Sequence, residues 1–212
     1  MACCILGISL QRSAKSYDPL TEVIHMKDVE QKIIQATLDL FVTRQYDGMT
    51  IPMIAKAAHI GVGTVYNYFE NKESLVNAIY RTVFADAISF IRREDDRADL
   101  SFKERFDLYY KRLFEFSVTK KNMILFLKYN SSAYYISPES KDSRQGLVNF
   151  LVAFLAEGKA AGFIKDVPQA LYMPIIYAPI EMLVTNAAKN EVKDMSKYAD
   201  TMLEFTWNAL KA

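Results

Sequence analysis

Four polar side chains fall close together in the stretch GTVYNYF, residues 63–69. Asn67 carries a carboxamide that can pair with the edge of an adenine, and Thr64 carries groups that suit a thymine methyl or a phosphate. Val65 and Phe69 lie four residues apart, so a helix over this stretch buries them and turns the polar side chains outward. Each polar residue alone is typical of any exposed helix. Their combination predicts a surface that reads DNA in the major groove.

The elements that would hold this surface form the stretch TIPMIAKAAHIGVGTVYNYFENK, from Thr50 to Lys72. Its first half has apolar residues at the i, i+3, i+4 and i+7 positions of one helix face: Ile51, Ile54, Ala55 and Ala58. Thr50 is a suitable N-cap for that helix, and A-H-I-G interrupts the pattern before a second short helix begins. Two short helices joined by a tight turn are the layout of a helix-turn-helix, whose second helix enters the major groove.

The residues IAKAAHIGVGTVYNYFENKESL resemble the signature of the tetracycline-repressor (TetR) family of bacterial regulators, and the resemblance extends from about Asp28 to Leu75. It implies that Tyr66 lies at the DNA surface, while Tyr68 and Lys72 contact the DNA backbone. The partner implied is a double-stranded, palindromic operator. The residues expected at the DNA are Thr50, Gly61, Val62, Gly63, Thr64, Tyr66, Asn67, Tyr68 and Lys72.

Two features of this stretch bear on phosphate contacts. Gly61 and Gly63 let the backbone approach phosphates closely. Lys72 falls in the first turn of the next helix, after the expected N-cap Asn71, where the helix dipole disfavours a cation. From the residues alone, a phosphate contact and a solvated lysine explain Lys72 equally well, and the resemblance favours the phosphate.

Three positions depart from the family pattern: His59 replaces the usual turn glycine, Gly61 a common Ser or Thr cap, and Val62 a frequent Lys or Arg. We expect a structural role for His59, because His is among the residues that tolerate positive φ. The head, residues 26–72, has five basic and five acidic residues and no net charge. A shallow salt dependence of DNA binding should follow. The same features suit an alternative, a helical protein-interaction module that has lost DNA binding.

The composition excludes several classes of protein. Of 212 residues, 51% are hydrophobic and 24% charged, as in an ordinary folded domain. The two cysteines, Cys3 and Cys4, are neighbours and make no disulfide framework, which fits a reducing cytoplasm. No apolar run approaches the roughly 18 residues of a membrane span. The two histidines, His25 and His59, lie near no nucleophile or carboxylate pair, so we expect no enzyme, no metal and no cofactor.

The periodicity of apolar residues predicts an all-α fold of about nine helices. Besides the two short helices, the predicted spans are 27–45, 72–92, 101–118, 122–133, 138–161, 167–189 and 195–210. The span 138–161 is apolar around much of its circumference and should be central. Pro174 and Pro179 should kink or break the span 167–189. The expected parts are an N-terminal extension at 1–25, a head at 26–72, and a ligand-binding and dimerisation domain at 73–212. We expect the extension to be a flexible tail or to reflect a start codon upstream of Met26. The alternative is an arm in the minor groove, for which only Arg12 and Lys15 are suitable.

Aromatic residues recur at helical spacing in the C-terminal domain. Such a stripe is most often plain core, but buried tyrosine hydroxyls need partners, and an apolar pocket with a few polar tips is the usual small-molecule site. The resemblance implies a small-molecule effector, and we expect a flat or elongated apolar one that changes the angle of the helix at 72–92. The candidate ligand-binding residues are Phe106, Tyr109, Tyr110, Met123, Phe126, Tyr129, Phe150, Phe154 and Tyr177.

A single helix-turn-helix offers few base contacts, and such readers usually bind as two-fold dimers on half-sites about 34 Å apart. The resemblance implies that the last two helices pair with those of a second copy. These residues suit the core of a single chain as well. The candidate interface residues are Tyr172, Ile176, Ile180, Leu183, Val184, Met202, Phe205 and Trp207. The expected function is therefore a homodimeric repressor that a small apolar or aromatic molecule releases from its operator.

Overall fold

The computed structural model describes residues 19–93 and 99–212, with side chains from Asp28 onwards. The helices are α1 (Pro19–Arg44), α2 (Ile51–Ala57), α3 (Val62–Tyr68), α4 (Lys72–Arg92), α5 (Phe102–Thr119), α6 (Lys121–Asn130), α7 (Pro138–Ala160), α8 (Tyr172–Ile176), α9 (Ala178–Ala188) and α10 (Ala199–Leu210). Short 3-10 turns, η1 (Gln169–Leu171) and η2 (Ser196–Tyr198), precede α8 and α10. The described ranges contain no strand, so the all-α prediction is confirmed.

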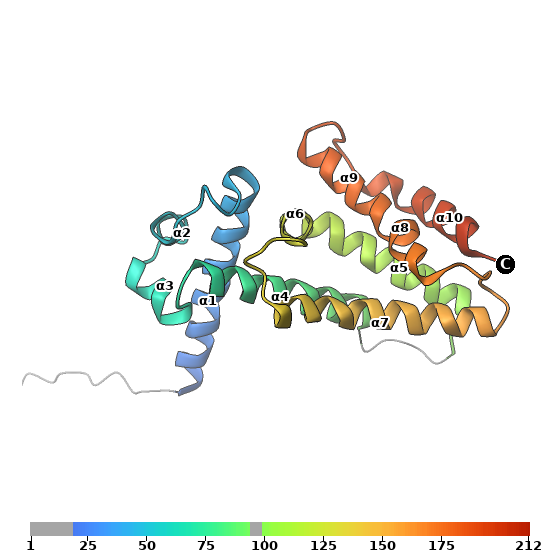
Figure 1. Cartoon of the computed structure of the whole chain (residues 1–212), viewed down its shortest axis with the longest axis horizontal. Coiled ribbons are helices and arrows are strands. Elements are labelled where there is room, and N and C mark those ends of the chain that lie inside the picture. Colours follow the sequence, from blue (N-terminus) through green and yellow to red (C-terminus); the bar gives the residue numbers. More distant parts are fainter. Residues whose placement is uncertain (1–18, 94–98) are drawn as a thin grey trace, which may run out of the picture.

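The head consists of α1, α2 and α3 and lies at one end of the elongated molecule (Figure 1). Its core includes Ile33, Phe41, Ile54 and Val65, all buried. The same apolar cluster continues without a break into α4 and α6, where Leu75 and Phe126 belong to it. A three-helix unit of this size buries too little surface to be very stable alone, so its core is completed by the body.

The long helix α4 leaves the head and runs along the body beside α7 (Figure 1). It begins with a capping box. The Asn71 side-chain oxygen accepts a hydrogen bond from the Ser74 amide, and the Asn71 amide donates to the Ser74 hydroxyl oxygen. By length and composition α4 would suit a membrane span, but half of that segment is buried inside the protein. Its apolar character is therefore explained by its position between head and body.

The body has a second apolar core, built from α5, α7, α8, α9 and α10 around residues such as Phe102, Phe106, Leu155 and Ile180. The prediction that α7 is central is wrong. Only four of its residues are buried: Ser140, Phe154, Leu155 and Gly158. Its larger apolar side chains, such as Leu147, Phe150 and Leu151, are half-buried, because α7 packs along α4 on one side and borders the two hollows and the surface elsewhere.

Local signals placed most helix ends correctly. Ser101 and Ser137 cap α5 and α7, and Gly162, at φ 77°, follows the end of α7. Two details differ. α1 extends back to Pro19, the first described residue, and is therefore longer than the helix predicted from Lys27. Other ends move by a few residues, because α6 stops at Asn130 and the turns before α8 and α10 are 3-10.

The predicted break in the eighth helix is confirmed. One apolar span is divided into α8 and α9 at Tyr177, and Pro179 lies in the first turn of α9. With this division the described helices correspond to the predicted nine. The predicted extension lies largely outside the described residues, as do Arg12, Lys15 and most of the charged linker at 92–97.

Candidate functional site

The polar face of α3 points away from the protein. Val65 is fully buried and Phe69 follows it into the core, while Tyr66 has 52% of its surface exposed. Asn67 is exposed beside it, and Thr64 is half-buried. The structure thus brings these predicted side chains together on one outer surface. An exposed helix face with a carboxamide, a hydroxyl and an aromatic ring has the chemistry of a major-groove reader.

The turn between α2 and α3 has the geometry that the sequence indicated. His59 lies at φ 56°, the left-handed conformation usually given to glycine. Its amide donates to the Lys56 carbonyl, and the Ile60 amide donates to Ala55. Gly61 is the N-cap of α3 without a side-chain cap bond. Thr50 is the N-cap of α2, but the predicted hydroxyl bond is not formed.

Nothing inside the protein requires glycine at two positions of α3 and its cap. A Cβ added to Gly63 would meet no atom within 4 Å, and one added to Gly61 would meet only the Thr64 hydroxyl at 3.6 Å. Both positions are exposed. A glycine that neither strain nor crowding demands is explained well by the close approach of an external molecule.

Lys72 has partners inside the head. Its ammonium donates to the carbonyl oxygens of Tyr46, at 2.8 Å, and Met49, at 3.0 Å. It also lies 3.9 Å from the centre of the Tyr46 ring. This arrangement ties the start of α4 to the turn after α1. A structural role is thus a third explanation for this lysine, besides the phosphate contact and the solvated side chain.

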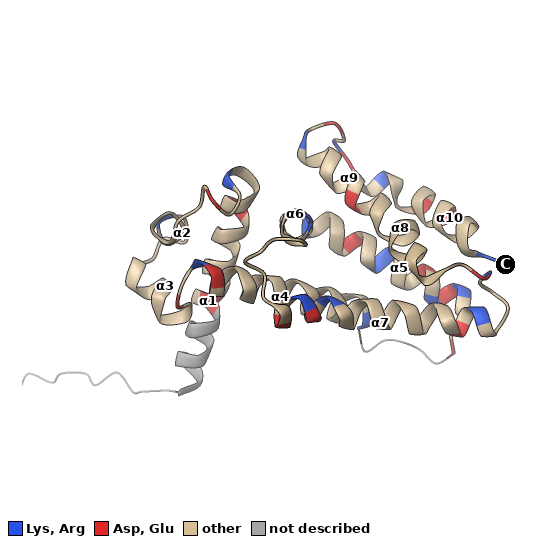
Figure 2. Ribbon diagram, viewed as in Figure 1, with Lys and Arg blue, Asp and Glu red and all other residues tan. Residues whose placement is uncertain are grey.

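Charge is sparse around the recognition helix. α3 carries no charged residue, and Figure 2 shows it entirely in tan. The nearest helix, α2, contributes one cation, Lys56, which is exposed in its last turn. Any contact of α3 itself with DNA phosphates must therefore be made by backbone amides, hydroxyls and aromatic rings.

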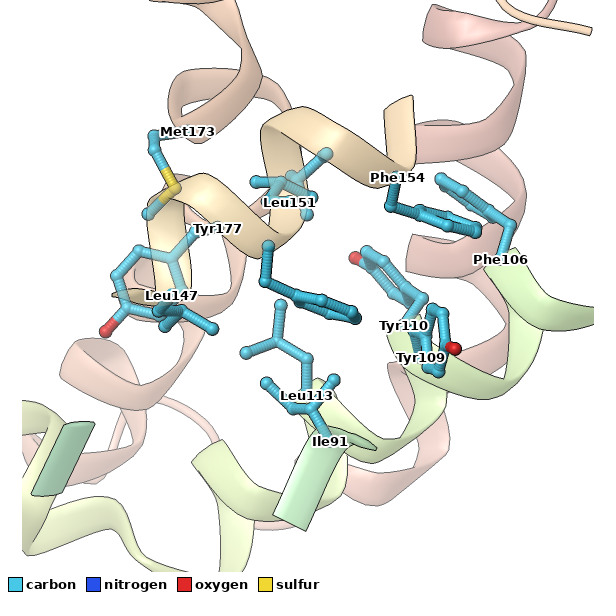
Figure 3. A pocket seen from close by; sticks show the side chains of 12 residues that line it. Ile91, Phe106, Tyr109, Tyr110, Leu113, Leu147, Leu151, Phe154, Met173 and Tyr177 are labelled. Atoms are coloured by element: carbon cyan, nitrogen blue, oxygen red, sulfur yellow. The ribbon is translucent and has the colours of Figure 1, made fainter. Parts of the chain in front are cut away.

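A cavity of about 50 Å³ lies inside the body, and we call it the inner cavity. Figure 3 shows Phe106, Tyr109, Tyr110 and Phe154 on one side and Met173 and Tyr177 on the other. The lining residues are Ile91, Phe106, Tyr109, Tyr110, Leu113, Leu147, Phe150, Leu151, Phe154, Met173, Ile176 and Tyr177. Six of them are among the nine predicted ligand-binding residues. The aliphatic members were missed, because an aliphatic residue at helical spacing does not differ from ordinary core.

The polar groups around the inner cavity are turned to other partners. The Tyr110 hydroxyl accepts a hydrogen bond from the Thr206 hydroxyl at 3.1 Å. Burial raises the pKa of Tyr110, and this hydrogen bond opposes the shift. The inner cavity is therefore suited to hydrocarbon.

A larger hollow of about 360 Å³, the outer chamber, adjoins the inner cavity. Its walls are mostly apolar and include Tyr80, Phe84, Leu127 and Val148. Its charged lining residues are Lys128, Arg144 and Glu181. The Lys128 ammonium lies 3.8 Å from a Glu181 carboxylate oxygen and donates to the Thr185 hydroxyl at 2.8 Å. The outer chamber thus joins an apolar wall to two cations, one of which, Lys128, is paired with a carboxylate.

The outer chamber opens toward the surface. A third, open hollow shares Tyr80, Ser131 and Arg144 with it and is bordered by Lys141 and Gln145. Lys141, Arg144 and Gln145 are exposed on α7. An amphiphile that enters here would meet cations first and apolar walls afterwards.

Three predicted ligand-binding residues lie outside both hollows. Met123 and Phe126 belong to the core between head and body, where Phe126 packs edge-on against Phe41 with ring centres 5.0 Å apart. Tyr129 is 47% exposed. All three lie on α6, whose apolar side faces α1 as well as α9, and periodicity could not tell which neighbour each side would meet.

The predicted interface residues divide into two groups. Tyr172, Ile176, Ile180 and Val184 are buried within the chain itself. Leu183, Met202 and Trp207 are half-buried, and Phe205 is 68% exposed. Met182 on α9, which was not predicted, is 56% exposed. The outer side of α9 and α10 therefore presents large apolar side chains to solvent, whereas the buried four serve the core.

Known proteins resemble this chain over nearly its whole described length. Residues 80–212 match the family described as "Tetracyclin repressor-like, C-terminal domain", and residues 33–79 match "Bacterial regulatory proteins, tetR family". The fatty acid metabolism regulator protein of Bacillus subtilis is 25% identical over 177 residues, covering 82% of this chain and 91% of that protein.

Two further relatives differ in what their names record. The biofilm operon icaADBC negative transcriptional regulator IcaR of Staphylococcus epidermidis is 28% identical over 120 residues, covering 57% of this chain and 62% of that protein. The crystal structure of Bacillus subtilis FadR in complex with stearoyl-CoA has a TM-score of 0.67 at 21% identity, covering 83% of this chain and 96% of that one. Together with the helix-turn-helix geometry, the two family matches show that the chain belongs to the tetracycline-repressor family of transcriptional regulators, which are not enzymes.

Proposed function

We propose that this protein is a cytoplasmic homodimeric repressor, and that an elongated apolar molecule with an acidic head releases it from a palindromic operator. The observation that carries the effector is the pair of adjoining hollows: Lys128 and Arg144 line the outer chamber, Arg144 also borders the open hollow, and none of the described residues that line the inner cavity is charged. The outer chamber alone falls within the usual size of a small-molecule site, about 300–1,000 Å³. A straight hydrocarbon chain bearing a carboxylate or phosphate fits this distribution of charge.

Relatives support this choice of effector. The Bacillus subtilis sequence relative is named as a regulator of fatty acid metabolism, and the structure of Bacillus subtilis FadR contains stearoyl-CoA. These names describe the relatives and not this chain. In this chain the independent support is the placement of the two cations. Burial and the nearby Glu181 carboxylate raise the pKa of the Tyr177 hydroxyl, so it remains a neutral donor in the outer chamber.

The route from effector to DNA would run through α4. Its first turns pack in the head, where Leu75 and Val76 are buried. Its later turns line both hollows, Tyr80 and Phe84 in the outer chamber and Ile91 in the inner cavity. A ligand shifts the head only if it binds one setting of this helix better than another. An effector that occupies both hollows touches the helix that carries the head.

The experiment begins with selection of bound sequences from random duplexes, followed by gel-shift titration of the enriched site. We expect an enriched palindrome, and we expect palmitoyl-CoA and palmitate to weaken its binding, whereas coenzyme A alone does not. If a sequence is enriched but its binding does not respond to saturating palmitate or palmitoyl-CoA, this effector class is excluded, while the proposal that the protein binds a specific operator stands.

The second candidate function is a helical protein-interaction module that has lost DNA binding. The uncharged α3 and the replacement of a common cation by Val62 favour it. The same selection separates the two functions, because the interaction module predicts no enriched sequence.

A further inference from the structure

We infer that the inner cavity measures the length of the effector's hydrocarbon chain, and that Met173 and Tyr177 form the partition that the chain must pass. This inference rests on the proposed function, because it assumes an effector with a linear chain and a polar head in the outer chamber. It adds a specificity-determining element, the apolar inner end of the site, and assigns it to named residues.

The partition is defined by the residues that line both hollows. Four side chains do so: Leu113, Leu147, Met173 and Tyr177. They come from α5, α7, α8 and the break between α8 and α9. A wall shared by two spaces separates them, and a chain that extends from the outer chamber into the inner cavity must displace part of it.

Two of the four wall residues, Met173 and Tyr177, lie beside the break between α8 and α9. Tyr177 lies between α8 and α9 with φ −102° and ψ −40°, and Pro174 and Pro179 flank it. Proline donates no backbone hydrogen bond, so Pro179 leaves the ladder without one bond at this break, although Tyr177 itself still donates to the Met173 carbonyl and accepts from the Glu181 amide. Methionine is unbranched and adapts to irregular space. Met173 and Tyr177 are therefore the wall residues that can move at least cost, whereas Leu113 and Leu147 are held on the unbroken helices α5 and α7.

The inner cavity accepts only hydrocarbon, and little of it. None of its described lining residues carries a charge, and the Tyr110 hydroxyl is already bonded to Thr206. A volume of about 50 Å³ admits a few water-sized groups, at roughly 10–15 Å³ each. A few terminal methylenes would fill it. Aromatic rings packed against each other line its far end, where Tyr109 meets Phe154 edge-on with ring centres 5.0 Å apart.

The size of the effect follows from methylene burial. Each methylene moved from water into the cavity contributes about 0.8 kcal/mol, which is about a fourfold gain in affinity. Affinity should therefore rise with chain length until the inner cavity is full and then stop rising. A shorter chain that ends in the outer chamber gains nothing from the inner cavity.

The test is a calorimetric titration of the full chain with straight-chain fatty acids: octanoate, laurate, myristate, palmitate and stearate. Leu151→Trp fills the inner cavity without touching the outer chamber, because Leu151 lines only the former. Leu151→Phe is a milder version. Ala153→Trp is the matched control, since Ala153 is exposed on the same helix and lines neither hollow.

We expect Leu151→Trp to retain the wild-type affinity for the shortest chains that bind and to lose tenfold or more for the longest, with Leu151→Phe intermediate. Ala153→Trp should bind every chain like the wild type. Retained short-chain affinity also demonstrates that the variant is folded. Met173→Ala, which thins the partition, should raise affinity for long chains more than for short ones.

Two outcomes would overturn the inference in distinguishable ways. If the wild type binds the fatty acids and Leu151→Trp alters all chain lengths equally or none, the inner cavity does not measure length while the proposed effector class stands. If no fatty acid binds the wild type, the effector class itself fails, and the length measurement fails with it.

Discussion

The ring of Tyr46 in the head stacks on the ring of Tyr135 in the body, with centres 3.7 Å apart and planes 14° from parallel. Tyr46 follows α1, and Tyr135 lies between α6 and α7. The Tyr135 hydroxyl donates to the Asn130 side-chain oxygen at 2.6 Å. Burial, with the neighbouring Tyr46 adding to it, raises the pKa of Tyr135 to about 12, so this donor stays protonated at neutral pH.

This stack gives head and body a second junction besides α4. The two junctions are linked, because Asn77 of α4 donates to the Tyr135 carbonyl at 2.7 Å and accepts from the Ser137 amide at 2.7 Å. The helices on either side of Tyr135 also line the outer chamber, through Lys128 of α6 and Arg144 of α7. A change in the chamber can therefore reach the head through the stack as well as through α4.

The first prediction concerns Tyr135. Tyr135→Ala removes a buried ring and should lower the free energy of unfolding by roughly 3 kcal/mol. It should also reduce the effect of palmitoyl-CoA on operator affinity. Tyr135→Phe keeps the ring and loses only the hydroxyl, so it should cost about 1–2 kcal/mol and retain the response. Denaturant unfolding and gel shifts measure the two effects. An unchanged response in Tyr135→Ala would exclude the stack as a route.

The second prediction separates the roles of Lys72. Its two carbonyl partners predict that Lys72→Met lowers the free energy of unfolding by about 1.5–3 kcal/mol, the value of hydrogen bonds to a charged group. A phosphate contact instead predicts a decrease of about 0.9 per protomer in the slope of log affinity against log salt. We expect the loss of stability with an unchanged slope. A fully stable variant with a decreased salt slope would instead show that Lys72 contacts a DNA phosphate.

The sequence was sufficient where the cause of a structure is local. Asn71 and Ser101 cap helices through atoms three residues away. His59 takes the positive φ that the turn requires, and Pro179 starts a new helix because it cannot donate to the old one. Each of these depends on a few neighbouring residues, so a single stretch contains the information.

The sequence was insufficient where a side chain has several apolar neighbours to choose from. Periodicity identified Ile176 and Ile180 as apolar positions, but the structure turns them into the chain's own core and leaves Phe205 outside. The partners of Lys72 lie 23 and 26 residues away. The place of Tyr177 between two hollows depends on α5, α7 and α8 together. Such relationships arise only when distant segments pack.

The third prediction tests the exposed glycine of the recognition helix. Gly63→Ala should leave the fold intact or stabilise it by up to about 1 kcal/mol, because alanine is the better helix residue and its Cβ meets nothing. The same methyl group should weaken operator binding if the backbone approaches a phosphate. Gly146→Ala on α7, where the Cβ would lie 3.2 Å from the flexible end of Ile88, is the control and should not alter DNA affinity. If Gly63→Ala bound DNA with the wild-type affinity, a close approach of the Gly63 backbone to a phosphate would be excluded.

The fourth prediction is a shallow salt dependence of operator binding. α3 carries no charge, and the head has as many acidic as basic residues. Each neutralised phosphate contributes about 0.9 to the slope of log affinity against log salt. Gel-shift titrations over a range of potassium chloride concentrations measure this slope. A slope of about nine or more per dimer, equivalent to some ten phosphates, would contradict it.

The fifth prediction concerns the outer side of α9 and α10. Met182 and Phe205 are large apolar side chains that are more than half exposed, and such patches mark interfaces. Phe205→Glu places a charge there without disturbing the core, so it should give a folded monomer with at least tenfold weaker operator binding. Val42→Glu is the control, because Val42 is an exposed apolar residue on α1, remote from this surface. Light scattering measures the mass of each protein. If Phe205→Glu remained dimeric, the two copies would have to meet elsewhere, because a buried glutamate without a partner costs several kcal/mol and a tight interface could not hold two of them.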